Sequence, residues 1–267
     1  MGTVLVTGGT GLLGAVVARQ PIGAGHDVRI LSRSASPEVP PPVACIRGDL
    51  RTGVGLHRAL AGTDAVVHCA SDPRAFQDVD VAGTRRLVET ASRLGRPHLV
   101  YISIVGVDRI PWVHYRAELA AEHLVEHAGS PWTILRTTQF REFSRDLLER
   151  LTRLPLIPVV PGWRFQPIDV RIAAQHLVAA VTTGPAGRLP DLGGPEVLGM
   201  ADLVGTYLRA TGQHRRPVRL PVPGRFSAAF RAGANLAESN RSEGLTWREF
   251  LAARASRPGA DARSRPR

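Results

Sequence analysis

Short apolar runs alternate with helix-like patterns over the first half of the chain. The spacing predicts helices over residues 12–20, 54–61, 79–94 and 115–127, and the aliphatic, β-branched runs predict strands over residues 3–7, 28–31, 43–46, 65–69, 99–104 and 132–135. Strands that alternate with helices in this way form right-handed βαβ units around a parallel sheet. The pattern therefore predicts an α/β fold with a doubly wound parallel sheet.

The pattern changes after residue 150, where prolines interrupt it. We predict helices over 172–181 and 201–210 and an edge strand over 217–222, with a Gly-Gly-Pro turn at 193–195. The chain is thus expected to have a nucleotide-binding domain over 1–155. A smaller region over 156–255 would cover the substrate and return one helix and one strand to the main sheet. Residues 256–267, rich in Arg, Pro, Gly and Ser, predict a disordered basic tail.

Composition narrows the class of protein. The chain of 267 residues has no apolar run of the roughly 20 residues that a membrane span needs, and no basic leader precedes its first strand. Its two cysteines, Cys45 and Cys69, are too few for a disulfide framework. We expect a cytoplasmic protein without a membrane partner, either a monomer or a homodimer.

Every one of the 34 basic residues is arginine, and 23 acidic residues leave a net charge of +11. The absence of lysine excludes Schiff-base and P-loop chemistry, whereas arginine suits an anionic ligand. Because the arginines are scattered, with one tight cluster at Arg215, Arg216 and Arg219, we do not expect nucleic-acid binding.

A glycine cluster follows the first predicted strand. Gly9, Gly11 and Gly14 give the spacing G-x-G-x-x-G, and Gly8 adds an overlapping pattern. After a strand and before a helix, such glycines allow the backbone to approach a diphosphate at the helix N-terminus. The sequence therefore predicts a Rossmann-type dinucleotide site, whose first contacts are Gly8, Gly9, Thr10, Gly11, Leu12 and Leu13.

The end of the second strand favours NADP(H) as the cofactor. An NAD site usually has a carboxylate there for the ribose 2′-hydroxyl, but this chain has Ser32 and Arg33, which suit a 2′-phosphate. Asp49 and Leu50 follow the third strand, and the Asp49 carboxylate is expected to accept a bond from the adenine amino group. The fourth strand ends beside the cofactor with the small residues Cys69, Ala70 and Ser71.

The chain resembles the atypical short-chain dehydrogenase/reductases, in particular the NmrA-like NAD(P)H-binding group. The resemblance is carried by the glycine cluster and by the segments 48–50, 80–85, 101–108, 131–136 and 166–170. It implies NADP(H) binding and, in active members, hydride transfer to a carbonyl, a quinone or a similar small molecule.

Active members also have a serine after the fifth strand and a Tyr-x-x-x-Lys pair at the next helix. Ser103 matches the serine, but His114 and Glu118 stand at the positions of the tyrosine and the lysine. The usual lysine lowers the tyrosine pKa and holds the nicotinamide ribose. A glutamate cannot lower that pKa, although Glu118 could still accept bonds from the ribose hydroxyls.

Several interpretations of this site follow. His114 is a candidate acid, Tyr115 could swing in beside Ser103, or a quinone-like acceptor needs no protein acid. We favour an NADPH-dependent reductase of a small, aromatic or quinone-like carbonyl compound. The alternative is a regulator that binds and senses NADP(H) without catalysing a reaction.

Two further groups of residues complete the sequence picture. Residues 123–127 read H-x-x-E-H, but they lie on a helix that already packs on the sheet, so we expect no metal site. The substrate pocket is expected to use the aromatic side chains that follow the fifth and sixth strands, namely Trp112, Phe140, Phe143, Trp163 and Phe165.

Overall fold

The computed structural model describes residues 2–20, 26–34 and 43–255, and these residues form two compact units. Residues 1–137 and 170–192 make up the first unit, and residues 138–169 and 193–267 the second. None of the described helices is long and apolar enough to cross a membrane.

A seven-stranded parallel sheet organises the first unit, in the order β3-β2-β1-β4-β5-β6-β9. The strands are β1 (Thr3–Thr7), β2 (Asp27–Ser32), β3 (Ala44–Arg47), β4 (Ala65–His68), β5 (His98–Ile104), β6 (Trp132–Thr137) and β9 (Gly187–Arg188). The strand order reverses direction between β1 and β4, which creates a crevice at their carboxyl ends. The predicted Rossmann-type doubly wound sheet is confirmed.

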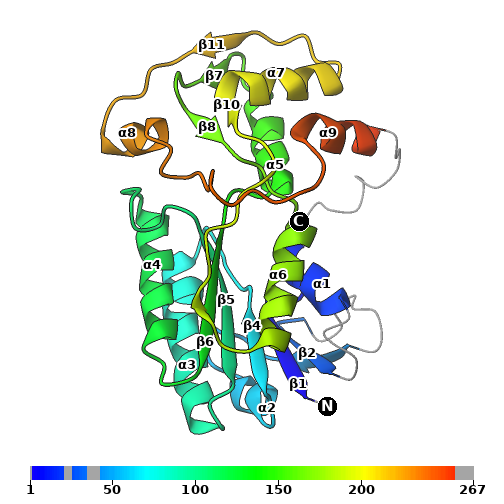
Figure 1. The fold of residues 1–267 in the computed structure, drawn as a ribbon, viewed down its shortest axis with the longest axis vertical. Helices are drawn as coiled ribbons and strands as arrows, with labels where there is room; N and C mark the ends of the chain where they lie inside the picture. Colours follow the sequence, from blue (N-terminus) through cyan, green and yellow to red (C-terminus); the bar gives the residue numbers. More distant parts are fainter. Residues whose placement is uncertain (1, 21–25, 35–42, 256–267) are drawn as a thin grey trace. The chain divides into compact units, whose positions relative to one another are not determined.

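Helices cover both faces of this sheet (Figure 1). They are α1 (Leu12–Arg19), α2 (Leu56–Leu60), α3 (Ala82–Arg93), α4 (Val113–Glu126) and α6 (Val170–Thr183). Leu87 of α3 and Val125 of α4 pack with Leu5, Val66 and Ile134 in one core. α1 and α6 lie together on the other face. α1 ends at Arg19, one residue before the predicted end.

The helix predicted over 79–94 begins differently from the prediction. A π-helical turn, η1 (Gln77–Val81), precedes α3, and it carries the buried Asp80. π-helical turns within helices are rare and are frequent at functional sites. Side-chain periodicity gives no direct signal for such a turn, so the sequence did not indicate it.

The second unit contains α5 (Arg141–Leu151), β7 (Ile157–Val159), β8 (Arg164–Phe165), β10 (Leu198–Gly199), α7 (Met200–Ala210), β11 (Pro217–Arg219), α8 (Arg225–Arg231) and α9 (Trp247–Ala255). β10 pairs with β8, and β11 with β7. Trp247, 1% exposed, packs with Leu203 and Tyr207 in the core of this unit. The sequence pattern predicted α7 and the start of the edge strand, but not α5, α8 and α9. Residues 256–267, where we expect the tail, lie outside the described residues.

Candidate functional site

The crevice between β1 and β4 contains a cavity of about 250 Å³. Most of the predicted cofactor contacts line it, together with five residues that were not predicted as cofactor contacts: Leu31, Gly48, Arg51, Asp72 and Val79. The predicted contacts that line it are Gly8, Thr10, Gly11, Ser32, Arg33, Asp49, Leu50, Cys69, Ala70 and Ser71. Gly9, Leu12, Leu13 and Glu118 are not among the lining residues.

The loop after β1 is shaped for close approach of a ligand to the backbone. Gly8 has φ +67°, and a Cβ there would lie 2.7 Å from the carbonyl oxygen of Cys69. A Cβ on Gly14 would overlap the carbonyl oxygen of Gly8. Only glycine fits at either position. The N-terminus of α1 therefore opens directly onto the cavity, which is the geometry that binds a diphosphate.

Two arginines lie at the far side of this cavity. Arg33 is exposed just after β2, at the position where NAD sites have a carboxylate. The Nη2 atom of Arg51 lies 3.0 Å from Oδ2 of Asp49 and its Nε lies 3.2 Å from the same oxygen. These bonds from Arg51 lower the pKa of Asp49. The Asp49 carboxylate, predicted to meet the adenine, is therefore held by Arg51. The sequence reasoning missed Arg51; its position two residues after Asp49 could have indicated this contact.

Cys69 lies in the wall of the cavity, where burial raises the pKa of its thiol to about 12. A thiol with such a pKa stays neutral and is a weak nucleophile. Its position fits the small-residue role predicted for residues 69–71.

A second group of candidate site residues lies where β5 faces the start of α4. Ser103 is 2% exposed, and its Oγ has no hydrogen-bond partner among the described residues. Tyr101, two residues earlier on β5, donates a hydrogen bond of 2.6 Å to Oε2 of Glu118. Because alternate residues of a strand share a face, Ser103 points to the same side of the sheet as Tyr101. Ser103 therefore lies on the side of the sheet that α4 covers, where Glu118 meets Tyr101.

His114 and Tyr115 lie in the first turn of α4 and pack with aromatic rings. The Trp112 ring lies 5.6 Å from that of His114 and 5.3 Å from that of Tyr115, and the Phe76 ring lies 5.9 Å from that of His114. Burial lowers the pKa of His114 and raises that of Tyr115 to about 12. The catalytic roles that the sequence suggested for these residues stay predictions.

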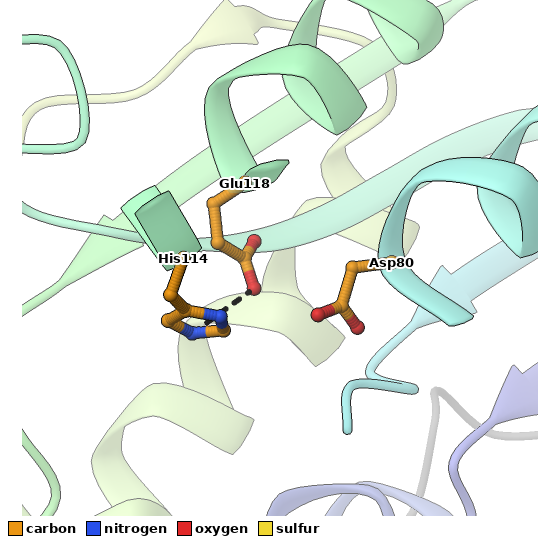
Figure 2. Close-up of side chains that lie close together, drawn as sticks. All are labelled: Asp80, His114 and Glu118. Atoms are coloured by element: carbon orange, nitrogen blue, oxygen red, sulfur yellow. Dashed lines mark ion pairs between the residues drawn. The ribbon is translucent and has the colours of Figure 1, made fainter. Parts of the chain in front are cut away.

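Asp80, His114 and Glu118 form what we call the acid–histidine cluster (Figure 2). Nε2 of His114 lies 3.9 Å from Oε1 of Glu118, and Asp80 reaches toward them from η1. Burial is the main cause that raises the pKa of Asp80 to about 6 and that of Glu118 to about 8. The backbone N–H of Asp72, a cavity residue, donates to Oδ1 of Asp80 at 3.1 Å. The cluster therefore adjoins the cofactor cavity.

One turn further along α4, Glu122 belongs to a different environment that we call the arginine network (Glu122, Arg136, Arg188 and Asp108). Nε and Nη2 of Arg136 donate to the two carboxylate oxygens of Glu122 at 2.8 and 2.7 Å, and Arg188 Nη2 donates at 3.2 Å. Nη1 of Arg136 also pairs with Asp108 at 3.0 Å. Each charge in this network has a partner.

The aromatic residues predicted for the substrate pocket are distributed over the two units. Trp112 belongs to the first unit and is 44% exposed. Within the second unit, Trp163 and Phe165 pack with Phe230, whose ring lies 4.8 Å from that of Trp163. Phe140 is half-buried and Phe143 is 55% exposed. The described ring contacts bring Trp163 and Phe165 together, but not Phe140 and Phe143.

Comparison with known proteins agrees with this geometry. Residues 8–152 match the NAD(P)H-binding family. The chain belongs to that family. This assignment confirms the resemblance to the atypical short-chain dehydrogenase/reductases noted from the sequence.

Two relatives are reductases. The chain is 30% identical to (4-alkanoyl-5-oxo-2,5-dihydrofuran-3-yl)methyl phosphate reductase of Streptomyces griseus, over 81% of this chain and 75% of the relative. It is 36% identical to 2-alkyl-3-oxoalkanoate reductase of Stenotrophomonas maltophilia, over 86% and 81% of the two chains. The structure of a nucleoside-diphosphate-sugar epimerase from Staphylococcus aureus matches with a TM-score of 0.75 and 20% identity, covering 94% of this chain and 99% of that one. This last likeness shows the fold alone.

Proposed function

We propose that this NAD(P)H-binding chain is an NADPH-dependent reductase of a small, conjugated carbonyl compound, of an aromatic or quinone-like kind. The observation that carries the proposal is the cavity between β1 and β4, with a glycine-lined backbone at one side and Arg33 at the other. A side chain at Gly8 would collide with the backbone of Cys69 and Ala70, so the loop after β1 stays open. Such a glycine loop suits the diphosphate of a dinucleotide.

Each part of the cofactor is assigned to residues of the cavity. Backbone N–H groups at the start of α1 bind the diphosphate, because they have no partner within the helix and lie at the positive end of its dipole. Ser32 and Arg33 bind the 2′-phosphate, and Arg51 supplies a second positive charge beside it. When bound, NADPH supplies a hydride at its nicotinamide ring.

The acceptor end lacks the usual Tyr-x-x-x-Lys pair, and this favours a particular class of substrate. The hydroxyl of Ser103 donates a hydrogen bond to the acceptor oxygen, while the rings of His114 and Tyr115 flank the acceptor. A conjugated acceptor spreads the charge that it receives with the hydride, so that solvent can protonate it. The names of the two related reductases describe oxo compounds with alkyl or alkanoyl groups, which supports a small carbonyl compound as substrate.

Cofactor choice is tested by calorimetry with NADPH and with NADH. Replacing Arg33 by alanine should weaken NADPH binding by about tenfold or more and leave NADH binding unchanged, because only NADPH has the 2′-phosphate. Arg93→Ala removes the same charge from an exposed position on α3 and serves as the control. Equal losses for both nucleotides in Arg33→Ala would contradict the assignment.

Turnover is tested by following NADPH absorbance without oxygen, with quinones and with a 2-alkyl-3-oxoalkanoate as acceptors. Ser103→Ala should lower kcat by about tenfold, since one hydrogen bond to a charged oxygen is lost, and leave NADPH affinity unchanged. Tight NADPH binding with no turnover of any acceptor would favour the alternative, an NADP(H)-sensing regulator.

A further inference from the structure

Three side chains of metal-binding type converge where α4 begins. His114 and Glu118 lie four residues apart on α4 and therefore share a face, while Asp80 approaches them from η1 (Figure 2). One ligand atom from each side chain lies within 4.8 Å of the other two. An imidazole and two carboxylates are suitable ligands for a divalent transition metal.

The acid–histidine cluster lacks a positive charge. Asp80 is 1% exposed and Glu118 is 3% exposed. Among the described residues, the one ion-pair partner of Glu118 is His114, whereas Glu122 on the next turn has two arginines. Burying carboxylates without a compensating cation is costly. A bound cation would remove that cost.

Two unsatisfied atoms also point to a ligand in this cluster. Oδ2 of Asp80 and Nδ1 of His114 are buried, and neither has a hydrogen-bond partner among the described residues. Buried polar atoms of this kind are rare in folded proteins and call for an explanation such as an ion. The Asp80 carboxylate points toward Glu118 and His114 (Figure 2).

We propose that Asp80, His114 and Glu118 bind a divalent transition-metal ion of the Zn²⁺ type. Bonds of about 2.0–2.2 Å require the ligand atoms to lie roughly 3–3.5 Å apart, a distance that small side-chain rotations from the present positions can reach. One of these ligands, Glu118, stands at the sequence position where the family's Tyr-x-x-x-Lys pair has its lysine.

The H-x-x-E-H segment gives the matched control. The rings of His123 and His127 lie 6.5 Å apart on α4, and Nδ1 of His127 bonds to the carbonyl oxygen of His123. His123 and His127 are both exposed, so this pair could bind zinc weakly at the surface. Zinc bound there would be independent of Asp80 and Glu118.

Zinc binding is measured by calorimetry on the full chain after treatment with a chelator and its removal, without NADPH or substrate. The native chain should bind one equivalent of Zn²⁺. Asp80→Asn should weaken this binding at least tenfold, and Glu118→Lys should abolish it, because the ammonium group replaces the ion. The chain carrying both His123→Gln and His127→Gln should bind like the native chain.

Thermal unfolding gives a second measurement. Zn²⁺ should raise the Tm of the native chain and of the His123/His127 double variant, but not that of Glu118→Lys. If Glu118→Lys fails to fold, Asp80→Asn decides the result. The proposal is overturned if the native chain binds no zinc, if Asp80→Asn binds zinc as the native chain does, or if the equivalent disappears in the double variant. All of these outcomes are independent of reductase turnover.

Discussion

Glu118 and Glu122 lie one turn apart on α4 and are both almost fully buried, but their surroundings have opposite charge. Glu122 accepts bonds from Arg136 and Arg188 in the arginine network. Glu118 faces Asp80 and His114 in the acid–histidine cluster and accepts a bond from the neutral Tyr101 hydroxyl. The two residues are of the same type, lie on the same helix and are almost equally buried, so they differ mainly in their neighbours.

The difference teaches that burial of a carboxylate does not by itself indicate its role. In the arginine network the charges satisfy one another, so the network holds α4 against β6 and has no need of a ligand. In the acid–histidine cluster two carboxylates have no arginine partner, so their charge is avoided by taking up a proton, as the raised pKa values of Asp80 and Glu118 indicate, or is balanced by a bound cation. Functional sites are places where such local costs are expected.

The largest effect should come from breaking the arginine network. Arg136→Met leaves the fully buried Glu122 with only the partly exposed Arg188, so the free energy of unfolding should fall by about 3 kcal/mol. Urea unfolding followed by circular dichroism measures this change. The control Arg116→Met removes an exposed arginine from α4, the helix that carries Glu122, and should change the free energy of unfolding by no more than about 0.5 kcal/mol. Equal effects of the two substitutions would remove the distinction between the regions.

An opposite effect is expected at Glu118. At about pH 9, above the pKa of about 8 that burial gives Glu118, the metal-free chain holds a buried negative charge next to Asp80; Glu118→Gln removes that charge and keeps an acceptor for Tyr101, so stability should rise by about 1–2 kcal/mol. Glu122→Gln is the matched substitution, and it should destabilise the chain because Arg136 and Arg188 each lose one of their ionic partners. The same urea unfolding experiment compares the two. A loss of stability in both variants would contradict the contrast drawn above.

The smallest effect concerns Asp108, at the exposed edge of the arginine network. Although burial alone raises the pKa of Asp108, the hydrogen bond and charge of Arg136 lower it below the usual value. The stabilisation is therefore present above the unfolded-state pKa, about 4, and is lost as the pH falls through the lower folded-state value.

Asp108→Asn should accordingly be less stable than the native chain at pH 6, with the difference shrinking as the pH falls below about 4. Because the Asp108 side chain is 42% exposed, solvent screening limits the effect to less than about 1 kcal/mol. Unfolding in urea at several pH values between 3 and 6 measures the difference. A gap that stays constant over this range would mean that the charge of Asp108 does not contribute.

The regular part of the fold could be predicted well from the sequence. The apolar runs place β1 and β4 within a residue of their observed bounds, since a strand buried on both faces gives a strong continuous signal. The second unit was harder. α5 has apolar residues at Phe143, Leu147, Leu148 and Leu151, yet Phe143 and Leu147 are exposed, so its pattern does not mark one buried face clearly.

The candidate site divides in the same way. Most of the residues predicted as cofactor contacts line the cavity, because glycines after a strand end have a known geometric effect; their contact with the cofactor stays a prediction. The acceptor end could not be predicted, since Asp80 is separated from His114 by 34 positions and depends on a π-helical turn for its placement. The sequence indicated that Glu118 departs from the family motif, but not which side chain it meets.

The return of residues 170–192 to the first unit has a consequence for how the chain folds during synthesis. The polypeptide passes between the units after residues 137, 169 and 192. α6 covers one face of the sheet beside α1, so a ribosome that has made only residues 1–155 holds a sheet with that face partly bare. Completion of the nucleotide-binding unit must therefore wait until the first segment of the second unit, residues 138–169, has already emerged.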